Sequence, residues 1–301
     1  MTVRLDGRSA IVTGAGNGLG RAHALLLAKL GAKVVVNDPG SSVDGRGASK
    51  VADNVVEEIR ALGGEAVANY AGVDDPVGAQ SIIDTCLQAF GKVDILVNNA
   101  GILRDKSFIK MELADFEAVM RVHLMGTVNC TKAAWPHMLE RKYGRIVLTT
   151  SGSGIAGSYG QSNYGAAKTA MLGLMNCLQF EGAKSNVLVN CICPIAATRM
   201  TENLLPKEME KYLAPDQVSP AVAWMASDAC TTSGNVITGG AGYFANIRFF
   251  KTEGVQFDPR GPVTVDMFAD AWPQIDDLST AKLNRGFAAD ASRKLAEVGA
   301  L

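Results

Sequence analysis

The sequence predicts an α/β fold in which one doubly wound parallel sheet is covered by helices on both faces. Short runs of β-branched residues alternate with longer helical patterns along most of the chain, and this alternation is typical of such sheets. A glycine-rich turn also follows the first of these runs directly. With 301 residues, of which 48% are hydrophobic, the chain is long enough to bury one large core.

The expected strands are short hydrophobic segments rich in valine and isoleucine. They are predicted at Ser9–Thr13, Lys33–Asn37, Ala66–Tyr70, Val93–Val97, Arg145–Thr150, Val187–Ile192 and Asn235–Thr238. The segments between them follow the helical period of about 3.6 residues. The helices are expected to begin near Leu19, Ala48, Pro76, Glu112, Ser162 and Pro220, with one more after Thr201.

Two segments are longer than the connections that such a fold needs. The first, residues 39–48 (PGSSVDGRGA), is a glycine- and serine-rich insertion after the second strand. The second is the tail after the last strand, which has helical stretches near Val265–Trp272 and Phe287–Val298. We therefore expect a main domain over residues 1–242 and a helical C-terminal extension over residues 243–301.

The charge balance argues against binding to nucleic acids or to anionic membrane surfaces. The formal net charge is -1, the isoelectric point is near 6.3, and lysine and arginine form no block. The polar start of the chain and the lack of a long apolar run predict neither a secretion signal nor a membrane span. The six cysteines contain no CxxC pair, so we expect reduced core residues and no metal site.

The glycine-rich turn at residues 13–20 (TGAGNGLG) lies between a strand and a helix, as in a Rossmann-like fold. Its glycines let the backbone approach a pyrophosphate, whose charge the helix N-terminus stabilises. Asp38 ends the second strand, where a carboxylate binds the adenosine ribose and repels the 2′-phosphate of NADP. NAD is therefore the expected cofactor. Alternatively, Arg46 or Lys50 could fold back to receive that phosphate.

Tyr164 and Lys168 are four residues apart on a predicted helix, so their side chains share one helical face. A free phenol has a pKa of about 10, and a nearby ammonium favours its ionised form. Such a pair can accept and return a proton near neutral pH. Taken alone, a tyrosine and a lysine at this spacing more often belong to a solvated helix face.

Taken together, the motifs resemble those of the short-chain dehydrogenase/reductase family over nearly the whole chain. The matching segments are TGAGNGLG at 13–20, NNAG at 98–101, Ser151 and YGAAK at 164–168. The resemblance implies that Tyr164 is the catalytic acid/base, that Lys168 lowers its pKa, and that Ser151 binds the reacting oxygen. It also implies the following cofactor-binding residues: Gly14, Asn17, Gly18, Leu19, Gly20, Asp38, Val73, Asp74, Asn98, Asn99, Ala100, Gly101, Tyr164, Lys168, Pro194 and Thr198.

Three positions depart from the family pattern. His123 stands where the family usually has an asparagine that holds a water of the proton relay. An imidazole can bind that water too, or it can simply pack. Gly72 replaces the usual adenine-contacting acid, so Val73 or Asp74 is expected to contact adenine instead. Ile195 replaces a glycine and can reshape the turn that contacts the nicotinamide.

Within the family, the chain resembles the (3R)-hydroxyacyl-CoA dehydrogenase subgroup of peroxisomal multifunctional enzymes, which is also known as a type of 17β-hydroxysteroid dehydrogenase. The matches include NNAGILRD at 98–105, RVHL at 121–124, the insertion and the extended tail. The resemblance implies NAD-dependent oxidation of a (3R)-hydroxyacyl-CoA to a 3-oxoacyl-CoA in lipid β-oxidation, or of a steroid hydroxyl. It also implies a homodimer or tetramer, with the tail at the substrate pocket or at the dimer interface.

Two other interpretations stay open. An NADPH-dependent 3-oxoacyl or carbonyl reductase has the same fold, but Asp38 argues against it. A nucleotide-binding module without turnover would be more attractive if Ser151, Tyr164 or Lys168 were missing. The chain does not end in a Ser-Lys-Leu type of peroxisomal address, so the cytoplasm is the expected location.

Overall fold

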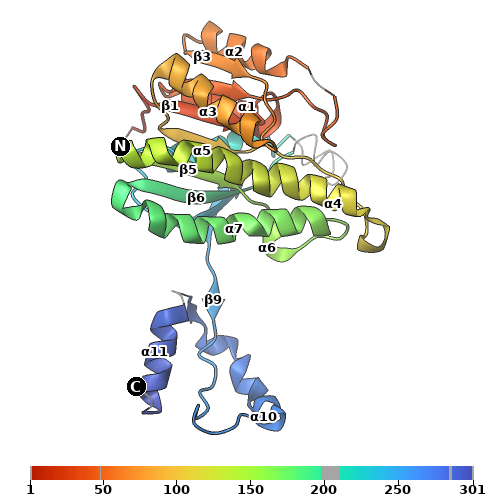
Figure 1. The fold of residues 1–301 in the computed structure, drawn as a ribbon, viewed down its shortest axis with the longest axis vertical. Helices are drawn as coiled ribbons and strands as arrows, with labels where there is room; N and C mark the ends of the chain where they lie inside the picture. Colours follow the sequence, from red (N-terminus) through yellow and green to blue (C-terminus); the bar gives the residue numbers. More distant parts are fainter. Residues whose placement is uncertain (1, 48, 198–210, 285–286, 300–301) are drawn as a thin grey trace. The chain divides into compact units, whose positions relative to one another are not determined.

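A sheet of eight strands forms the centre of the larger of two compact units, with helices on both of its faces (Figure 1). The computed structural model describes residues 2–47, 49–197, 211–284 and 287–299. The larger unit comprises Met1–Asn246 and the smaller unit Ile247–Leu301. The strand order is β3-β2-β1-β4-β5-β6-β7-β8. This architecture confirms the doubly wound α/β fold that the sequence predicts.

Strands β1 to β7 run parallel to their neighbours. Their bounds are β1 Ser9–Thr13, β2 Lys33–Asn37, β3 Ala66–Asn69, β4 Ile95–Asn98, β5 Gly144–Thr149, β6 Val187–Pro194 and β7 Val236–Gly240. These bounds differ from the predicted ones by at most two residues. The central strands are buried because helices cover both faces, which explains why they are continuous hydrophobic runs in the sequence.

The eighth strand, β8 (Tyr243–Ile247), lies at the edge of the sheet beside β7. Only Ala241 and Gly242 separate β7 from β8, so the two strands form a hairpin. The Val236 N–H also donates to Asn246 Oδ1 at 3.3 Å. The residues of β8 are all at least partly exposed. Because β8 has no buried hydrophobic run, the sequence does not predict it.

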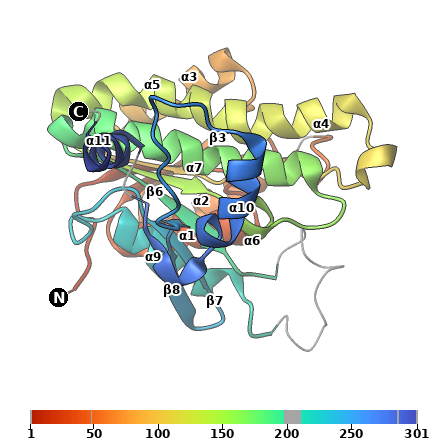
Figure 2. The same cartoon turned by 90° about the horizontal axis from the view of Figure 1, so that it is seen from below.

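The helices form two layers (Figure 2): α1 contacts α2 and α9 on one face of the sheet, whereas α3, α4, α5 and α7 cover the other face. Their bounds are α1 Gly18–Lys29, α2 Val51–Ala61, α3 Pro76–Phe90, α4 Leu113–Met120, α5 Gly126–Arg141, α6 Gly152–Ala156, α7 Ser162–Gly182 and α9 Ser219–Met225. Short helical turns are η1 Phe108–Lys110, η2 Arg121–Met125, η3 Ala183–Ser185 and η4 Pro215–Gln217. The helix predicted after Thr201 falls outside the described residues. In the described part of the chain, no helix combines the length and the apolar character needed to span a bilayer.

The strand order reverses between β1 and β4, which are neighbours in the sheet although β2 and β3 lie between them in the chain. In such sheets a crevice opens outside the carboxyl ends of the strands at this point. Thr13 ends β1, Asn98 ends β4 and Thr149 ends β5. The predicted site motifs follow these strand ends directly, so the fold brings them together on the side of the sheet where the parallel strands end.

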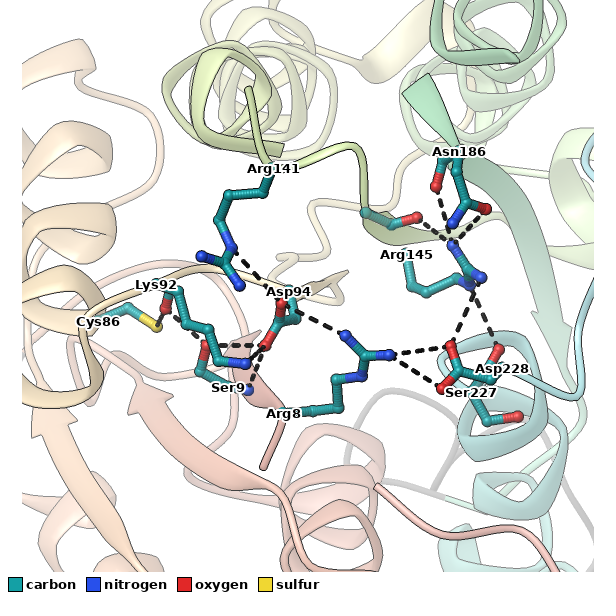
Figure 3. A network of polar contacts seen from close by, with 11 residues as sticks. Arg8, Ser9, Cys86, Lys92, Asp94, Arg141, Arg145, Asn186, Ser227 and Asp228 are labelled. Atoms are coloured by element: carbon teal, nitrogen blue, oxygen red, sulfur yellow. Dashed lines mark hydrogen bonds and ion pairs between the residues drawn. The ribbon is translucent and has the colours of Figure 1, made fainter. Parts of the chain in front are cut away.

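On the opposite side of the sheet, where the parallel strands begin, a network of charged side chains surrounds Asp94 (Figure 3). Asp94 is fully buried just before β4, and its carboxylate accepts the Ser9 N–H at 3.0 Å. Lys92 pairs with the carboxylate at 3.0 Å, and Arg8 and Arg141 approach it at 3.8 and 4.0 Å. A buried charge is tolerated only when such partners compensate for the lost hydration.

Arg8 also joins Asp94 to a second carboxylate, Asp228, which follows α9 and pairs with Arg8 at 2.9 Å. Arg145, at the start of β5, approaches the same carboxylate at 3.8 Å. Both guanidinium groups lie over the Tyr143 ring, 3.6 and 4.3 Å from its centroid. The network therefore connects the beginnings of β1, β4 and β5 with the segment after α9.

The described part of the smaller unit contains two helices, a helical turn and a short two-stranded sheet. Their bounds are β9 Phe250–Lys251, α10 Val265–Ile275, η5 Leu278–Thr280, β10 Lys282–Leu283 and α11 Phe287–Glu297. Glu253 pairs with Lys282 at 2.8 Å and with Arg293 and Lys294 at 3.0 Å each. Hydrogen bonds from these three cations lower the pKa of Glu253 to about 2, and the bond from Lys282 has the largest effect. One carboxylate thus connects the short sheet with α11.

Candidate active site

A cavity of about 560 Å³ lies beside the glycine-rich turn at the carboxyl edge of the sheet. Eleven of the residues predicted to bind the cofactor line it: Gly14, Asn17, Gly18, Leu19, Gly20, Asp38, Val73, Asp74, Asn99, Ala100 and Gly101. A Cβ on Gly14 would lie 2.7 Å from Ala100 Cα, and a Cβ on Gly20 would lie 2.1 Å from the Gly14 carbonyl oxygen. Only glycine fits at these two positions, so the backbone itself forms the wall, as a pyrophosphate site requires.

Asp38 lines this cavity with its carboxylate fixed by two backbone N–H groups. Oδ2 accepts from Gly16 at 2.9 Å, and Oδ1 accepts from Gly40 at 2.7 Å. Neither Arg46 nor Lys50 is among the residues that line the cavity. Arg46 lies 3.5 Å from a carboxylate oxygen within the insertion, and its side chain is 78% exposed. The cavity therefore presents a fixed negative charge at the place predicted for the adenosine ribose.

The segment after β4 is attached to the glycine-rich turn through Thr13. The Thr13 Oγ1 accepts the N–H groups of Asn99 at 3.0 Å and Ala100 at 3.1 Å. Asn98 is buried and is not among the lining residues. Its Nδ2 donates to Thr131 Oγ1 in α5 at 3.2 Å. Asn98 thus braces the sheet against a helix, whereas its two successors shape the cavity.

Tyr164 and Lys168 lie on one face of α7, as their spacing predicts. Lys168 Nζ lies 5.6 Å from the centroid of the Tyr164 ring and donates to the Thr149 carbonyl oxygen at 2.7 Å. Lys168 is only 4% exposed, and burial lowers its pKa to about 7. Burial therefore disfavours the charged form of this ammonium group.

Burial raises the pKa of Tyr164, and hydrogen bonding by Ser151 opposes this rise only in part. The sequence predicts the opposite direction, with the Lys168 ammonium stabilising the phenolate. That prediction is wrong for the structure as described. The phenol has lost most of its contact with water, and burial also disfavours the charge on Lys168 that was expected to help it.

Ser151 follows β5 and precedes the short helix α6. Its Oγ accepts the Ser153 N–H at 3.2 Å. The Ser153 hydroxyl donates in turn to Gln161 Oε1 at 2.7 Å, and Gln161 Nε2 donates to Asp105 at 2.6 Å. Because the Ser151 oxygen already accepts a backbone N–H, its own O–H can donate to a ligand.

His123 lies in η2, a π-helical turn between α4 and α5, and connects the cavity with Tyr164. Its ring packs edge-on against the Tyr164 ring, with 5.2 Å between the centroids. His123 Nε2 lies 3.0 Å from the backbone nitrogen and 2.8 Å from the carbonyl oxygen of Ile102, which lines the cavity. Nδ1 is buried and has no hydrogen-bond partner among the described residues. Burial lowers the pKa of His123 to about 3, so the ring is neutral at physiological pH.

A second buried histidine makes the stability of the fold sensitive to pH. His23 Nδ1 lies 2.8 Å from Ser219 Oγ, and burial lowers the pKa of His23 to about 3. In the unfolded chain both His23 and His123 titrate near a pKa of about 6.5. Below that pH the unfolded state binds protons that the folded state does not bind. The free energy of unfolding should then fall by about 1.4 kcal/mol per pH unit for each histidine.

Urea unfolding between about pH 6.5 and pH 5 measures this slope above the range in which most carboxyl groups titrate. A His23→Gln variant is expected to keep about half of the slope, since only His123 then remains as a buried neutral histidine. A wild-type free energy of unfolding that does not change over this interval would show that neither histidine resists protonation.

The insertion after β2 is part of the cavity wall, which the sequence does not predict. Its length and its glycine content were the only signals. It contributes lining residues together with the segment after β4 and the start of η2: Ser41, Ser42, Val43, Gly45, Gly47, Ile102, Arg104 and Arg121. Pro194 ends β6 and is not among the lining residues. Thr198 lies outside the described residues, so its role stays a prediction.

Comparison with known proteins places the sequence among dehydrogenases. The profile of a family described as short chain dehydrogenase matches residues 8–209. The peroxisomal multifunctional enzyme type 2 of Drosophila melanogaster is 49% identical over 299 residues. This match covers 98% of the chain and 49% of the fly enzyme, so the chain spans about half the length of that relative.

Solved structures agree with this result. The full-length fly enzyme gives a TM-score of 0.82 at 42% identity, covering 98% of this chain and 50% of that one. A short chain dehydrogenase from Mycobacterium avium gives 0.80 at 39% identity, covering 92% and 97%. A 7α-hydroxysteroid dehydrogenase in complex with NADH and 7-oxo glycochenodeoxycholic acid gives 0.72 at 30% identity, covering 79% and 95%.

Proposed function

The chain belongs to the short-chain dehydrogenase family, and we propose that it is an NAD-dependent enzyme that oxidises a (3R)-hydroxyacyl-CoA to a 3-oxoacyl-CoA. The observation that carries the proposal is the position of Tyr164, which packs edge-on against His123, whose Nε2 lies 3.0 Å from the backbone nitrogen of the cavity-lining Ile102. Lys168 lies over the same tyrosine ring, and Tyr164, Lys168 and Ser151 are not themselves among the lining residues. The substrate class is supported by the resemblance to the hydroxyacyl dehydrogenase subgroup and by the identity with the fly multifunctional enzyme.

In the proposed reaction, Tyr164 Oη removes the proton of the substrate hydroxyl. As this O–H bond breaks, a carbon–oxygen double bond forms, and the hydrogen on the same carbon leaves with its electron pair. Bound NAD supplies the acceptor for this hydride and, in its oxidised form, a positive charge that favours the phenolate. The Ser151 hydroxyl donates to the substrate oxygen and holds it in line with Tyr164.

His123 and Lys168 form the proposed route by which the proton leaves Tyr164. The unpartnered Nδ1 of His123 is a buried polar atom that can hold a water molecule. Lys168 Nζ donates to the Thr149 carbonyl oxygen and lies over the Tyr164 ring, 5.6 Å from its centroid. Since its pKa is about 3, His123 acts in this proposal by hydrogen bonding and keeps its neutral form.

Asp38 supports the preference for NAD over NADP. Each of its carboxylate oxygens accepts one backbone N–H and keeps a lone pair for a ribose hydroxyl. A 2′-phosphate at the same place would meet a fixed negative charge. Arg46, in the insertion, is exposed and lies 3.5 Å from a carboxylate oxygen of Asp44.

The test is NADH formation by the purified protein from NAD and a racemic 3-hydroxyacyl-CoA of medium chain length. Turnover is expected to stop near half conversion, because a stereospecific enzyme consumes one enantiomer. With NADP, kcat/KM should be at least about tenfold lower, which corresponds to about 1.4 kcal/mol of repulsion. Turnover of a 17β-hydroxysteroid but not of the acyl-CoA would assign a steroid dehydrogenase instead. A requirement for NADP(H) would assign a 3-oxoacyl or carbonyl reductase.

Assembly and location complete the proposal. We propose a homodimer or tetramer in which residues 243–301 contribute to the substrate pocket or to the subunit interface. The match to the fly enzyme over 98% of the chain, which includes this tail, supports a shared role. The cytoplasm stays the proposed location. The alternative is the peroxisome, because the fly relative is named as a peroxisomal enzyme.

A further inference from the structure

We propose that Arg104 is a positioning residue that holds the described part of the insertion, residues 39–47, against the nucleotide cavity and thereby slows the release of the cofactor. The inference rests on the proposed binding of NAD. It concerns a residue that touches neither Tyr164 nor Ser151 through any described hydrogen bond, and it explains why the insertion is folded onto the segment after β4.

The insertion forms one side of the cavity through Val43 and Gly45. It is attached to the segment after β4 at two points. The Leu103 N–H donates to the Val43 carbonyl oxygen at 2.9 Å, and Arg104 Nε donates to the Asp44 carbonyl oxygen at 3.1 Å. The first bond uses backbone atoms alone. The second depends on a side chain and can therefore be removed by substitution.

The guanidinium of Arg104 is itself held from a second direction. Its Nη1 pairs with Asp115 Oδ1 in α4 at 3.1 Å, and the two side chains are only 23% and 20% exposed. Lys106 pairs with the other oxygen of Asp115 at 3.2 Å. A planar guanidinium has separate donors that can bind the insertion and α4 at once, which an ammonium cannot do with the same geometry. Arg104 thus bridges the insertion to the rigid body of the fold.

The backbone of Arg104 is fixed independently of its side chain. Its carbonyl oxygen accepts from Asn163 Nδ2 at 3.0 Å, and Asn163 Oδ1 accepts the Tyr164 N–H at 2.7 Å. A side-chain substitution at position 104 leaves both of these bonds in place. Its effect should therefore fall on the nucleotide cavity, while the position of Tyr164 is preserved.

The experiment compares NADH binding to the wild-type protein and to Arg104→Met by the change in NADH fluorescence in equilibrium and stopped-flow measurements. Loss of charge-assisted hydrogen bonds predicts a Kd for NADH that is higher by about tenfold to a hundredfold. Most of this change should be a faster dissociation rate. In the steady state, KM for NAD should rise while kcat is not lowered, because Tyr164 keeps its position.

Lys106→Met is the matched control, since Lys106 pairs with the same carboxylate and has no described contact with the insertion. It should leave the NADH dissociation rate unchanged. Asp115→Asn is the second variant, which keeps Arg104 and its bond to Asp44 but weakens the anchor. It should also accelerate dissociation, though less than Arg104→Met. Because Arg104 itself lines the cavity, faster dissociation in Arg104→Met with no change in Asp115→Asn would assign Arg104 to direct contact with the nucleotide and would overturn the inference. If thermal melting shows that Arg104→Met does not fold, Asp115→Asn alone tests the inference.

An unchanged dissociation rate in the folded Arg104→Met or, failing that, in Asp115→Asn would overturn the inference. Equal acceleration by Lys106→Met would overturn it too, because loss of a nearby cation would then be sufficient. A parallel loss of kcat at saturating NAD would assign Arg104 to the alignment of Tyr164 instead. If the wild-type protein binds no NADH, the proposed function fails first and the inference falls with it.

Discussion

Replacement of Tyr164 by phenylalanine is expected to lower kcat by about 10²- to 10⁴-fold, the usual contribution of a general acid or base. The ring would remain to pack against His123, with which it makes an edge-on contact. Only the hydroxyl that accepts the substrate proton would be lost. Turnover of the hydroxyacyl-CoA and NADH titration by fluorescence, measured on the same preparation, separate chemistry from cofactor binding.

Tyr159→Phe is the matched control for this experiment, since Tyr159 lies just before α7 and is 93% exposed. It should leave kcat unchanged. NADH affinity should also be unchanged in both variants, because the cavity is lined by other residues. A Tyr164→Phe enzyme that keeps wild-type turnover would remove Tyr164 from the reaction and leave the dehydrogenase proposal without its base.

Replacement of Asp94 by alanine is expected to lower the free energy of unfolding by about 3 to 5 kcal/mol, the range found when one partner of a buried ion pair is removed. The carboxylate is fully buried and accepts the Ser9 N–H at 3.0 Å. Its loss would leave that N–H without a partner and would leave Lys92 and Arg8 close together without the negative charge that compensates them. Urea unfolding at neutral pH measures the effect.

Asp228→Ala is the matched control, because Asp228 belongs to the same network and pairs with the same Arg8 (Figure 3). Its side chain is 65% exposed, so water can replace the lost ion pair. The expected cost is below about 1 kcal/mol, as for other surface ion pairs. Equal destabilisation by the two substitutions would show that burial of Asp94 does not determine the strength of the network.

The strands and the cofactor turn could be predicted from the sequence because their signals are local. A strand buried on both faces is a continuous hydrophobic run, and the segment 9–13 is predicted with its observed bounds. The turn at 13–20 combines glycines with a preceding strand and a following helix. Tyr164 and Lys168 share a helix, so their proximity follows from spacing alone. Each of these features needs fewer than twenty residues of chain to be recognised.

The features that the sequence did not predict depend on contacts between distant segments. The insertion forms part of the cavity because Val43 and Asp44 are bonded to residues some sixty positions later. The raised pKa of Tyr164 follows from burial by several elements, which helical spacing does not reveal. The edge strand β8 pairs with β7 without a hydrophobic run of its own. Tertiary surroundings decide all three.

The π-helical turn at 121–125 limits the number of residues that can connect α4 to α5. Each residue of an α-helix turns its side chain by about 100° around the axis, and the wider turn accommodates one residue more. The angular phase of α4 is therefore offset from that of α5. His123 can reach Ile102 while Gly126, one turn later, packs closely against Val73. Deletion of a single residue in this turn would rotate α4 by about 100° relative to α5 and carry Asp115 away from Arg104. The turn can accept substitutions, but the number of its residues is fixed.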